Sequence, residues 1–236
     1  AEYVEGPTNA PLPTGSAHLV TVDADAVAEI GSDSYENTLV SALTELTYRS
    51  LRTAGSNSQN HSIYLILTVT NGVDANLDFL VFEPRYQNGS NTNLPSQGVA
   101  FNNVWSRWNA LNGGWYSYNH PEIASPGAPA PLNAGVQALS VYLAQYPNTK
   151  IINDGGSGIS LDAGDGVGLW SGFDGKVDEM IIGTNGASTA YNFELNAGLD
   201  CVATKYKDII IRTFTATDAS GNQRSSSQTI LVKDTT

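Results

Sequence analysis

Gly168–Gly183, GLWSGFDGKVDEMIIG, is the stretch of sequence that decides the fold. Its glycine-rich first half predicts a tight turn, and its second half predicts a β-strand that closes a sandwich. Alternate residues of a strand point to opposite faces, so Asp174 and Asp178 share one face while Glu179 points to the other. The stretch therefore predicts a structural strand, on which Asp178 caps a neighbouring loop.

Working outward, short apolar runs separated by turn residues predict roughly ten short strands in all. The clearest is IYLILTVT at Ile63–Thr70, which is rich in β-branched residues and pairs as a hairpin with Leu77–Phe82. Other predicted strands are Ala17–Asp23, Ser41–Ser50, Val99–Trp108, Trp115–Tyr118, Lys150–Asn153, Ile159–Leu161 and Ala190–Leu195.

One helix is predicted at Val136–Tyr146, where Val136, Leu139, Leu143 and Tyr146 recur at helical spacing before Pro147. The predicted fold class is all-β, an antiparallel jelly-roll-like sandwich with one short helix and a C-terminal hairpin or partial immunoglobulin-like extension. The expected organisation is an extended proline-rich arm at 1–15, a sandwich at 16–196 and a strand-rich tail at 197–236.

Composition limits the classes of partner. The 236 residues carry a net charge of −12 with only 11 Lys and Arg, and these are scattered singly, so nucleic acid is not an expected partner. No apolar run approaches the ~20 residues of a membrane span. A lysine-poor, Ser-, Thr-, Asn- and Gly-rich chain favours an extracellular or cell-surface location, and a cleaved signal peptide or a trimmed N-terminus would explain the start at Ala1.

Two resemblances follow from longer motifs. FDGKVDEMII at Phe173–Ile182 is similar to the last-strand signature of concanavalin-like, laminin-G-type sandwiches, and with VFEPRYQ and VWSRWNALNGGWYS it resembles a sandwich module of surface proteins over Ala17–Leu195. The segment FTATDASGN with TILVKDTT resembles the C-terminal half of a hyalin repeat. These resemblances imply a fold and leave the function open.

The tail predicts self-association. The runs Ile209–Ile211 and Ile230–Val232 are apolar on both faces of a strand, and a lone hairpin is at best marginally stable in water. Another subunit, the chain's own sandwich or residues lost by truncation would cover them. The expected partner is a further copy of the chain, in an oligomer or polymer, with an assembly interface at Cys201, Ile209, Ile211, Phe214, Ile230 and Val232.

Three kinds of binding site are candidates. Trp115, Tyr116 and Tyr118 suggest a platform for glycans, although aromatic rings more often fill a core. Oxygen-rich, glycine-containing loops suggest calcium, the one candidate cofactor, at Asp154, Asp162 and Asp165, and glycine-rich turns explain the same residues. Glycosylation sequons occur at Asn60 and Asn88.

No catalytic residue is predicted. A glycosidase needs two cooperating carboxylates. Asp174 and Asp178 share a face but lie four residues apart, and Glu179 points to the other face, so a closely spaced same-face pair is absent. The single Cys201 allows an intermolecular disulfide, a free thiol or a buried small hydrophobe. The expected function is that of a non-enzymatic extracellular structural protein that assembles through its terminal strands. The alternative is a lectin-like, carbohydrate-binding adhesion module.

Overall fold

The computed structural model describes residues 1–6, 9–12, 15–23, 25–53, 61–74, 76–89, 94–120, 122–123, 135–154, 156–165 and 170–193, with Glu5 by its backbone. It also describes the backbone of 206–217 and 223–233. The chain divides into two compact units, Ala1–Leu195 and Asn196–Thr236.

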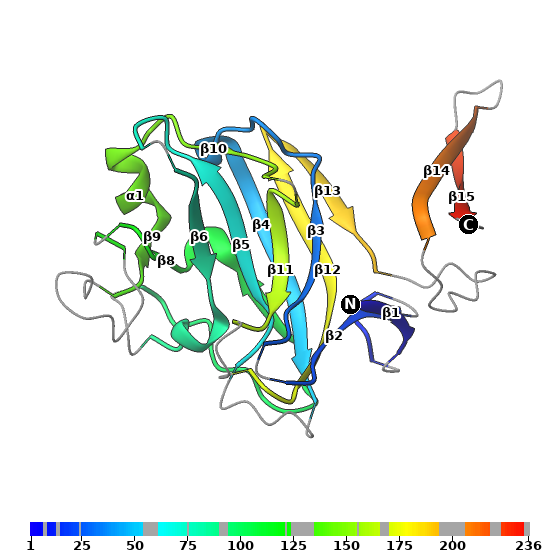
Figure 1. Ribbon diagram of the computed structural model, residues 1–236, viewed down its shortest axis with the longest axis horizontal. Helices are drawn as coiled ribbons and strands as arrows, with labels where there is room; N and C mark the ends of the chain where they lie inside the picture. Colours follow the sequence, from blue (N-terminus) through cyan, green and yellow to red (C-terminus); the bar gives the residue numbers. More distant parts are fainter. Residues whose placement is uncertain are drawn as a thin grey trace. The chain divides into compact units, whose positions relative to one another are not determined.

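The first unit is an all-β sandwich of two antiparallel sheets, as predicted (Figure 1). The first sheet has the order β1-β2-β12-β4-β7, and β13 also pairs with β12. Its strands are β1 (Glu2–Glu5), β2 (Gly15–Thr21), β4 (Leu43–Arg52), β7 (Ser106–Asn109), β12 (Phe173–Thr184) and β13 (Ala187–Tyr191).

The second sheet has the order β3-β11-β5-β6-β8-β9, and β10 also pairs with β5. Its strands are β3 (Ala28–Ser32), β5 (Tyr64–Thr70), β6 (Asp78–Phe82), β8 (Gly114–Ser117), β9 (Gln137–Ala138), β10 (Lys150–Ile151) and β11 (Ile159–Ala163). Among the described residues, the helices are α1 (Leu139–Gln145) and three 3₁₀ turns, η1 (Val40–Ala42), η2 (Pro84–Tyr86) and η3 (Ala110–Asn112).

The strand β12 lies in the middle of the first sheet, between β2 and β4. Its pairing with β4 shifts between Asp178 and Ile181, and Glu179 has a φ of 51°, so one extra residue forms a β-bulge. Phe173 and Val177 face the core before the bulge, and Met180 and Ile182 face it afterwards. The bulge therefore reverses the alternation that the sequence predicts.

Apolar side chains from both sheets fill the space between them. The largest fully buried ones are Tyr48, Phe82, Trp108, Trp115, Tyr142 and Phe173. On β5, Leu65, Leu67 and Val69 are fully buried at alternate positions, as the predicted strand requires. A smaller apolar cluster of Val81, Tyr116 and Val136 lies outside this core. Because Val81 and Tyr116 alternate with core residues, that cluster marks the outer face of the second sheet.

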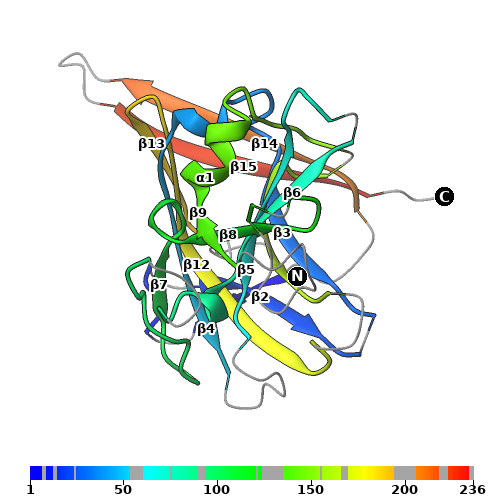
Figure 2. The same cartoon turned by 90° about the vertical axis from the view of Figure 1, so that its left-hand side faces the viewer.

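Several predicted elements differ in extent from the observed ones. The predicted strand Val99–Trp108 is reduced to β7, because Phe101 is 61 % exposed and Asn103 has a φ of 58°. The predicted helix starts later, at Leu139, since Gln137 and Ala138 pair with β8 as β9 (Figure 2). The segment predicted as a free arm contributes β1, which pairs along β2, so residues 1–15 are part of the sandwich unit.

The second unit contains a hairpin, β14 (Tyr206–Thr217) and β15 (Gln223–Lys233). The two strands pair antiparallel from Tyr206 opposite Lys233 to Thr217 opposite Gln223. The predicted turn at Ala219–Asn222 lies outside the described residues.

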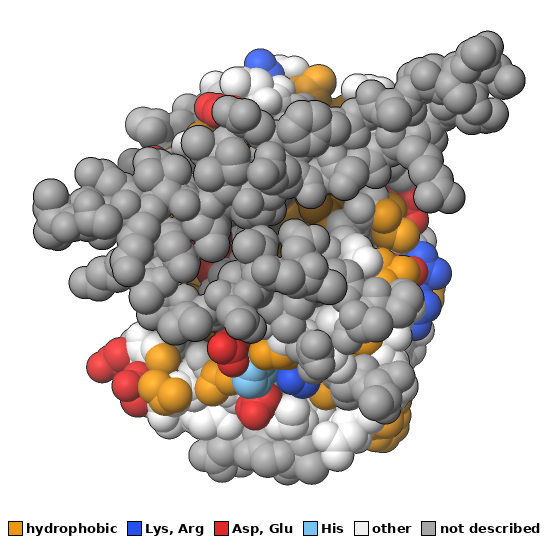
Figure 3. All heavy atoms as spheres, turned by 90° about the vertical axis from the view of Figure 1, so that its right-hand side faces the viewer, with side chains coloured by type: hydrophobic (Ala, Val, Ile, Leu, Met, Phe, Trp, Pro, Cys, Tyr) orange, Lys and Arg blue, Asp and Glu red, His pale blue; other side chains and the backbone are white. Residues whose placement is uncertain are grey.

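Surface charges are interspersed on the face of the molecule shown in Figure 3, where acidic and basic side chains neighbour hydrophobic ones over its described part. On β2, His18 lies between two acids, 3.1 Å from Glu2 and 3.0 Å from Asp174. Among the described helices, none has both the length and the apolar character to cross a bilayer.

Candidate functional site

A buried acidic group lies where β6 ends on the outer face of the second sheet. Glu83 follows Phe82, and its side chain is 3 % exposed. Burial raises the pKa of this carboxyl to about 7, and the nearby Arg85 opposes that rise. The Tyr116 hydroxyl donates to Glu83 Oε2 at 3.2 Å, and Arg85 Nε lies 2.7 Å from Oε1. The carboxyl group is thus held between a phenol and a guanidinium.

Arg85 connects Glu83 to a histidine. Its Nη1 lies 2.7 Å from His61 Nε2, and the guanidinium also lies over the Tyr86 ring at 4.5 Å from the centroid. The His61 ring stacks on Trp170, with centroids 4.4 Å apart and planes at 13°. Burial, with Arg85 second, lowers the pKa of His61 to about 4. A neutral imidazole therefore accepts the Arg85 hydrogen bond.

A second buried acid, Asp162, lies on the same outer face of the second sheet as Glu83, two strands away. It is 5 % exposed on β11, directly opposite Tyr64 of β5, and the Ser160 hydroxyl donates to it at 2.5 Å. Burial raises the pKa of Asp162 to about 7. Because Leu65 pairs with Phe82, Glu83 lies opposite Tyr64 on the side away from Asp162. The Cα atoms of Glu83 and Asp162 are therefore two strand spacings apart, or about 10 Å.

This pair of acids does not have the exposure of a catalytic pair. A general acid or base must come within hydrogen-bond reach of a substrate. Both carboxyl groups are enclosed, and each is already held by neighbouring protein groups. Their geometry supports a structural role, in which the raised pKa values make folding sensitive to pH.

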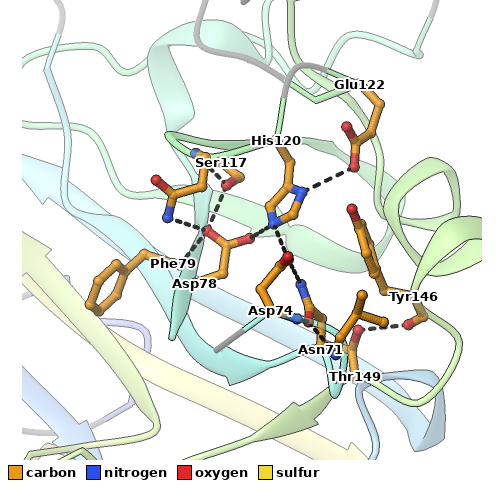
Figure 4. Close-up of polar contacts among 11 residues, drawn as sticks. Asn71, Asp74, Asp78, Phe79, Ser117, His120, Glu122, Tyr146 and Thr149 are labelled. Carbon is orange, nitrogen blue, oxygen red and sulfur yellow. Dashed lines mark hydrogen bonds and ion pairs between the residues drawn. The ribbon is translucent and has the colours of Figure 1, made fainter. Parts of the chain in front are cut away.

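A histidine–carboxylate cluster closes another part of the sandwich, where the loop before β6 meets the loop after β8 (Figure 4). His120 Nε2 lies 3.3 Å from Asp78 Oδ2 and 3.5 Å from Asp74 Oδ2, and Nδ1 lies 3.4 Å from Glu122 Oε1. The Ser117 hydroxyl donates to Asp78 Oδ1 at 2.6 Å. Serine and histidine thus both bond to the aspartate, so this is not the nucleophile–base arrangement of a hydrolase triad.

Two tyrosines of α1 and its C-terminal end pack against the same histidine. The Tyr142 ring centroid lies 5.1 Å from that of His120, and the Tyr146 centroid lies 4.8 Å away, both edge-on. Burial, followed by the charge of Asp78, raises the pKa of the Tyr142 hydroxyl. The cluster therefore fastens α1 to the end of the core.

An open groove of about 940 Å³ lies at the edge strand β7. Figure 2 looks onto this edge of the sandwich, where β7, β8 and β9 are visible. Hydroxyl, amide and apolar side chains dominate its lining, with one acid and one base. The lining residues are Thr44, Glu45, Thr47, Leu94, Pro95, Gln97, Arg107, Asn109, Leu111, Asn112 and Ala138. Such a volume lies within the range of small-ligand sites.

The predicted glycan platform is corrected by the structure. Trp115 is fully buried and donates from Nε1 to the Ala110 carbonyl at 2.8 Å, so it belongs to the core. Tyr116 is 4 % exposed and holds Glu83. Tyr118 is 63 % exposed, and its ring meets Tyr116 edge-on at 5.6 Å. A single exposed ring remains of the three.

The predicted calcium ligands do not converge. Asp162 is buried on β11, Asp154 is exposed and Asp165 is half-buried. Within the described part of the chain, no three His, Cys, Asp or Glu side chains form a group that could hold a metal ion. Asp154, Asp162 and Asp165 are therefore not brought together as a site.

The acids of β12 have structural partners. Asp178 is fully buried, and its Oδ2 accepts from the Leu12 backbone N–H at 2.9 Å, which confirms the predicted loop cap. Glu179 pairs with Arg49. Asp174 pairs with His18 at 3.0 Å.

The remaining predicted residues are placed only in part. Asn88 is exposed, as a glycan acceptor needs to be, while Asn60 lies outside the described residues. Cys201 also lies outside them. Ile209, Ile211 and Phe214 lie on β14, and Ile230 and Val232 lie on β15, by their backbones.

Neither the Glu83–Arg85–His61 contacts nor the groove was predicted as a site from the sequence. One local signal was present, because a Glu-Pro-Arg-Tyr run directly after an apolar strand puts two opposite charges at a strand end. His61 and Trp170 are 109 positions apart, and no local pattern connects them.

Comparisons of the chain with models of known protein families, with curated proteins and with solved structures found no match. The resemblances to laminin-G-type sandwiches and to hyalin repeats therefore stay predictions.

Proposed function

We propose that this protein is a non-enzymatic extracellular structural protein that self-associates through its C-terminal hairpin. One observation carries the proposal: β14 and β15 form a two-stranded sheet, and neither pairs with any other strand that the structure describes. Each strand is long, with 12 residues in β14 and 11 in β15.

The hairpin offers backbone edges for a partner strand. A two-stranded sheet is at best marginally stable in water, and each outer edge carries unpaired N–H and C=O groups. Ile209 lies opposite Leu231, and Ile210 lies opposite Ile230, so apolar pairs follow one another along the ladder. Because consecutive residues alternate between faces, the sequence makes both faces apolar there, and a further strand or sheet would cover them.

A second copy of the chain is the partner that this arrangement favours. Addition of a neighbour's strand satisfies the backbone edge, and a head-to-tail contact that does not close gives a filament. The engagement of Asp174, Asp178 and Glu179 in structural contacts supports the non-enzymatic part of the proposal.

Sedimentation velocity over a wide concentration range, with negative-stain electron microscopy, tests self-association of the full chain. We expect concentration-dependent oligomers or filaments, and Ile210→Lys should suppress them because it puts a charge into the apolar part of the ladder. Thr215→Lys, in the polar part of the same strand, is the matched control and should assemble. A full chain that stays monomeric throughout, or Ile210→Lys that assembles like the parent, would refute the proposal.

Carbohydrate binding is the second candidate function, and the groove beside β7 is the observation that favours it. Its hydroxyl and amide lining suits polyhydroxylated ligands. Trp115 and Tyr116 are buried and offer no ring surface to a sugar. Screening the full chain on an immobilised oligosaccharide array, with and without calcium, tests this function. Absence of binding under both conditions would count against it.

A further inference from the structure

The strand β13 forms an open edge of the first sheet. A two-residue turn at Asn185 and Gly186 joins it to β12, and both turn residues have positive φ, as a type I′ hairpin requires. Ala187 therefore forms the first hydrogen-bonded pair with β12, and the backbone groups of Ser188 and Ala190 point away from β12. Both residues are exposed, and β13 pairs with no other strand that the structure describes. Their N–H and C=O groups are open to a further strand.

The sequence of β13 lacks the usual protection of an edge strand. Natural sheets protect their edges with charges, proline, bulges or a covering group. The β13 residues ASTAY include no charge and no proline, and their register with β12 runs without a bulge. By contrast, β1 and β3 carry glutamates, the Gln97 side chain covers β7, and β9 and β10 have only two residues each. Among the described edges, β13 is therefore the one suited to accept a strand.

Apolar surface lies beside this edge. A small pocket opens between β13 and β3, which lie on the same side of the sandwich (Figure 1). Its apolar lining consists of Ile30, Met180, Tyr191 and Phe193, of which Ile30 and Tyr191 are only half-buried. Tyr191 lies opposite Met180, which faces the core, so alternate side chains of a strand added to β13 would point toward this pocket. An added strand with apolar residues would cover it.

Charge favours the hairpin of another copy as the added strand. Residues 1–195 carry 19 Asp and Glu against 6 Lys and Arg, a net charge of −13. The strands β14 and β15 carry 4 Lys and Arg against 1 Asp, a net charge of +3. A hairpin is thus attracted to a sandwich and repelled by a second hairpin. Acids also lie close to the β13 edge, since Glu45 accepts from the Ser188 hydroxyl at 3.0 Å and Glu29 lies on β3.

We infer that the β13 edge of one molecule accepts an outer strand of the β14–β15 hairpin of a second copy. The inference rests on the proposed self-association and names the surface that receives the hairpin. Ile209–Ile211 and Ile230–Val232 give each hairpin strand three consecutive apolar residues, so either strand offers an apolar side chain to the pocket at Ile30 and Tyr191. Because the donating and accepting surfaces differ, the contact is head-to-tail and can continue along a filament.

Proline at the β13 edge tests the accepting surface in the full chain. Ala190→Pro removes an outward N–H that the ladder with β12 does not use, so the variant should fold and melt close to the parent. It should stay monomeric in sedimentation velocity at concentrations where the parent assembles. Ala190→Val keeps the N–H at the same exposed position and should assemble like the parent. If Ala190→Pro does not fold, Ser188→Pro, which also loses an outward N–H, replaces it.

Mixing two damaged variants separates a head-to-tail contact from pairing between two hairpins. Ile210→Lys damages the hairpin and keeps β13, whereas Ala190→Pro damages β13 and keeps the hairpin. Each variant alone should be monomeric. An equimolar mixture should form a 1:1 heterodimer that grows no further, because a damaged surface remains at each of its ends. Native mass spectrometry with an affinity tag on one variant identifies this species by its mass.

Salt tests the charge argument with the unchanged protein. Attraction between hairpin and sandwich predicts that the apparent dissociation constant of the parent rises roughly threefold or more between 50 and 500 mM NaCl, because added ions screen the charges. Contact between two positively charged hairpins would strengthen instead, since salt would screen their repulsion. The sign of the salt dependence therefore distinguishes the two contacts.

Three results would overturn the inference and leave self-association standing: a folded Ala190→Pro that assembles like the parent, a mixture without heterodimer, or assembly that strengthens with salt. A parent that stays monomeric at every concentration would instead remove the inference together with the proposed function.

Discussion

The side chain of Gln87 bonds both backbone groups of Gly114, as a neighbouring strand would. Gln87 Oε1 accepts from Gly114 N at 2.8 Å, and Nε2 donates to Gly114 O at 2.9 Å and to Glu83 O at 3.0 Å. Gln97 forms the same pair of bonds with Asn109 on β7, at 2.8 and 2.9 Å. Side-chain amides thus satisfy backbone positions of β8 and β7, and cover the edge strand β7 against strand addition.

Gln87→Met tests this role. Methionine fills a similar volume but leaves the buried N–H and C=O of Gly114 unpaired, so the free energy of unfolding should fall by about 2–4 kcal/mol. Urea denaturation followed by tryptophan fluorescence measures it. Gln145→Met, at the exposed end of α1, is the control and should change stability by less than about 0.5 kcal/mol. Equal stability of the two variants would show that the amide bonds contribute nothing.

Asp162→Asn should change how stability depends on pH. Burial holds the pKa of Asp162 at about 7, whereas the unfolded chain ionises this group near pH 4. Between these values the unfolded state has released a proton that the folded state retains, so stability falls as pH rises through this window. The loss is on the order of 3–4 kcal/mol, and the asparagine variant should not show it.

Urea midpoints at pH 4, 5.5 and 7 measure that difference. The variant should gain stability relative to the parent as the pH rises. A constant offset between parent and Asp162→Asn at all three pH values would disprove the buried titration.

The contribution of His61 to stability should depend on pH in the opposite direction from that of Asp162, and His61→Phe should remove it. The folded-state pKa of His61 is lowered to about 4, by burial and then by Arg85, while the unfolded value is near 6.5. Stability from the neutral imidazole is complete above pH 6.5 and is lost as the pH falls toward 4, by about 2 kcal/mol after allowance for partial screening. Phenylalanine keeps an aromatic ring on Trp170 but cannot titrate.

Thermal unfolding of His61→Phe and His61→Ala between pH 4 and 7 distinguishes the loss of a titrating imidazole from the loss of the ring stacked on Trp170. Both variants should lack the acid-side loss, and the alanine variant should be less stable at every pH because it also loses the stacked ring. Retention of the full acid-side loss in both would show that another group titrates there.

Glu179 tests the β-bulge in β12. Its φ of 51° is in the left-handed region, where a β-branched side chain is strained and glycine is not. Glu179→Val should lower the free energy of unfolding by about 2 kcal/mol, from backbone strain and loss of the Arg49 pair. Glu179→Gly should stay within about 1 kcal/mol of the parent, because relief of strain offsets the lost pair. Chemical denaturation of both variants measures this, and a valine variant as stable as the glycine variant would contradict the bulge geometry.

Much of the sandwich could be predicted from local pattern. Residues 63–70 alternate apolar side chains, and the structure has β5 there with Leu65, Leu67 and Val69 buried. The hairpin of β5 with β6 and the strand β12 were found in the same way. Edge strand β3 was missed, because only its Ala28 is buried and the sequence there lacks an apolar alternation.

The candidate sites were less predictable. Trp115 and Tyr116 are neighbours in sequence, yet one fills the core and the other holds Glu83 on the outer face. Composition could not tell a core ring from a ligand platform, since both uses favour the same residue types. The groove depends on Thr47 lying opposite Asn109, a pairing across 62 positions of sequence.

The sequence by itself determined the all-β class, most strand positions and the loop-capping role of Asp178, because strand periodicity and turn chemistry are local properties of the chain. Only the tertiary structure decided which side chains meet: the Glu83–Arg85–His61 contacts, the groove floor at Thr47 and Arg107, and the core positions of Met180 and Ile182. The physical reason is register. One extra residue at Glu179 shifts the pairing of β12 with β4 and reverses which residues face the core, and no local pattern in GLWSGFDGKVDEMIIG specifies that shift.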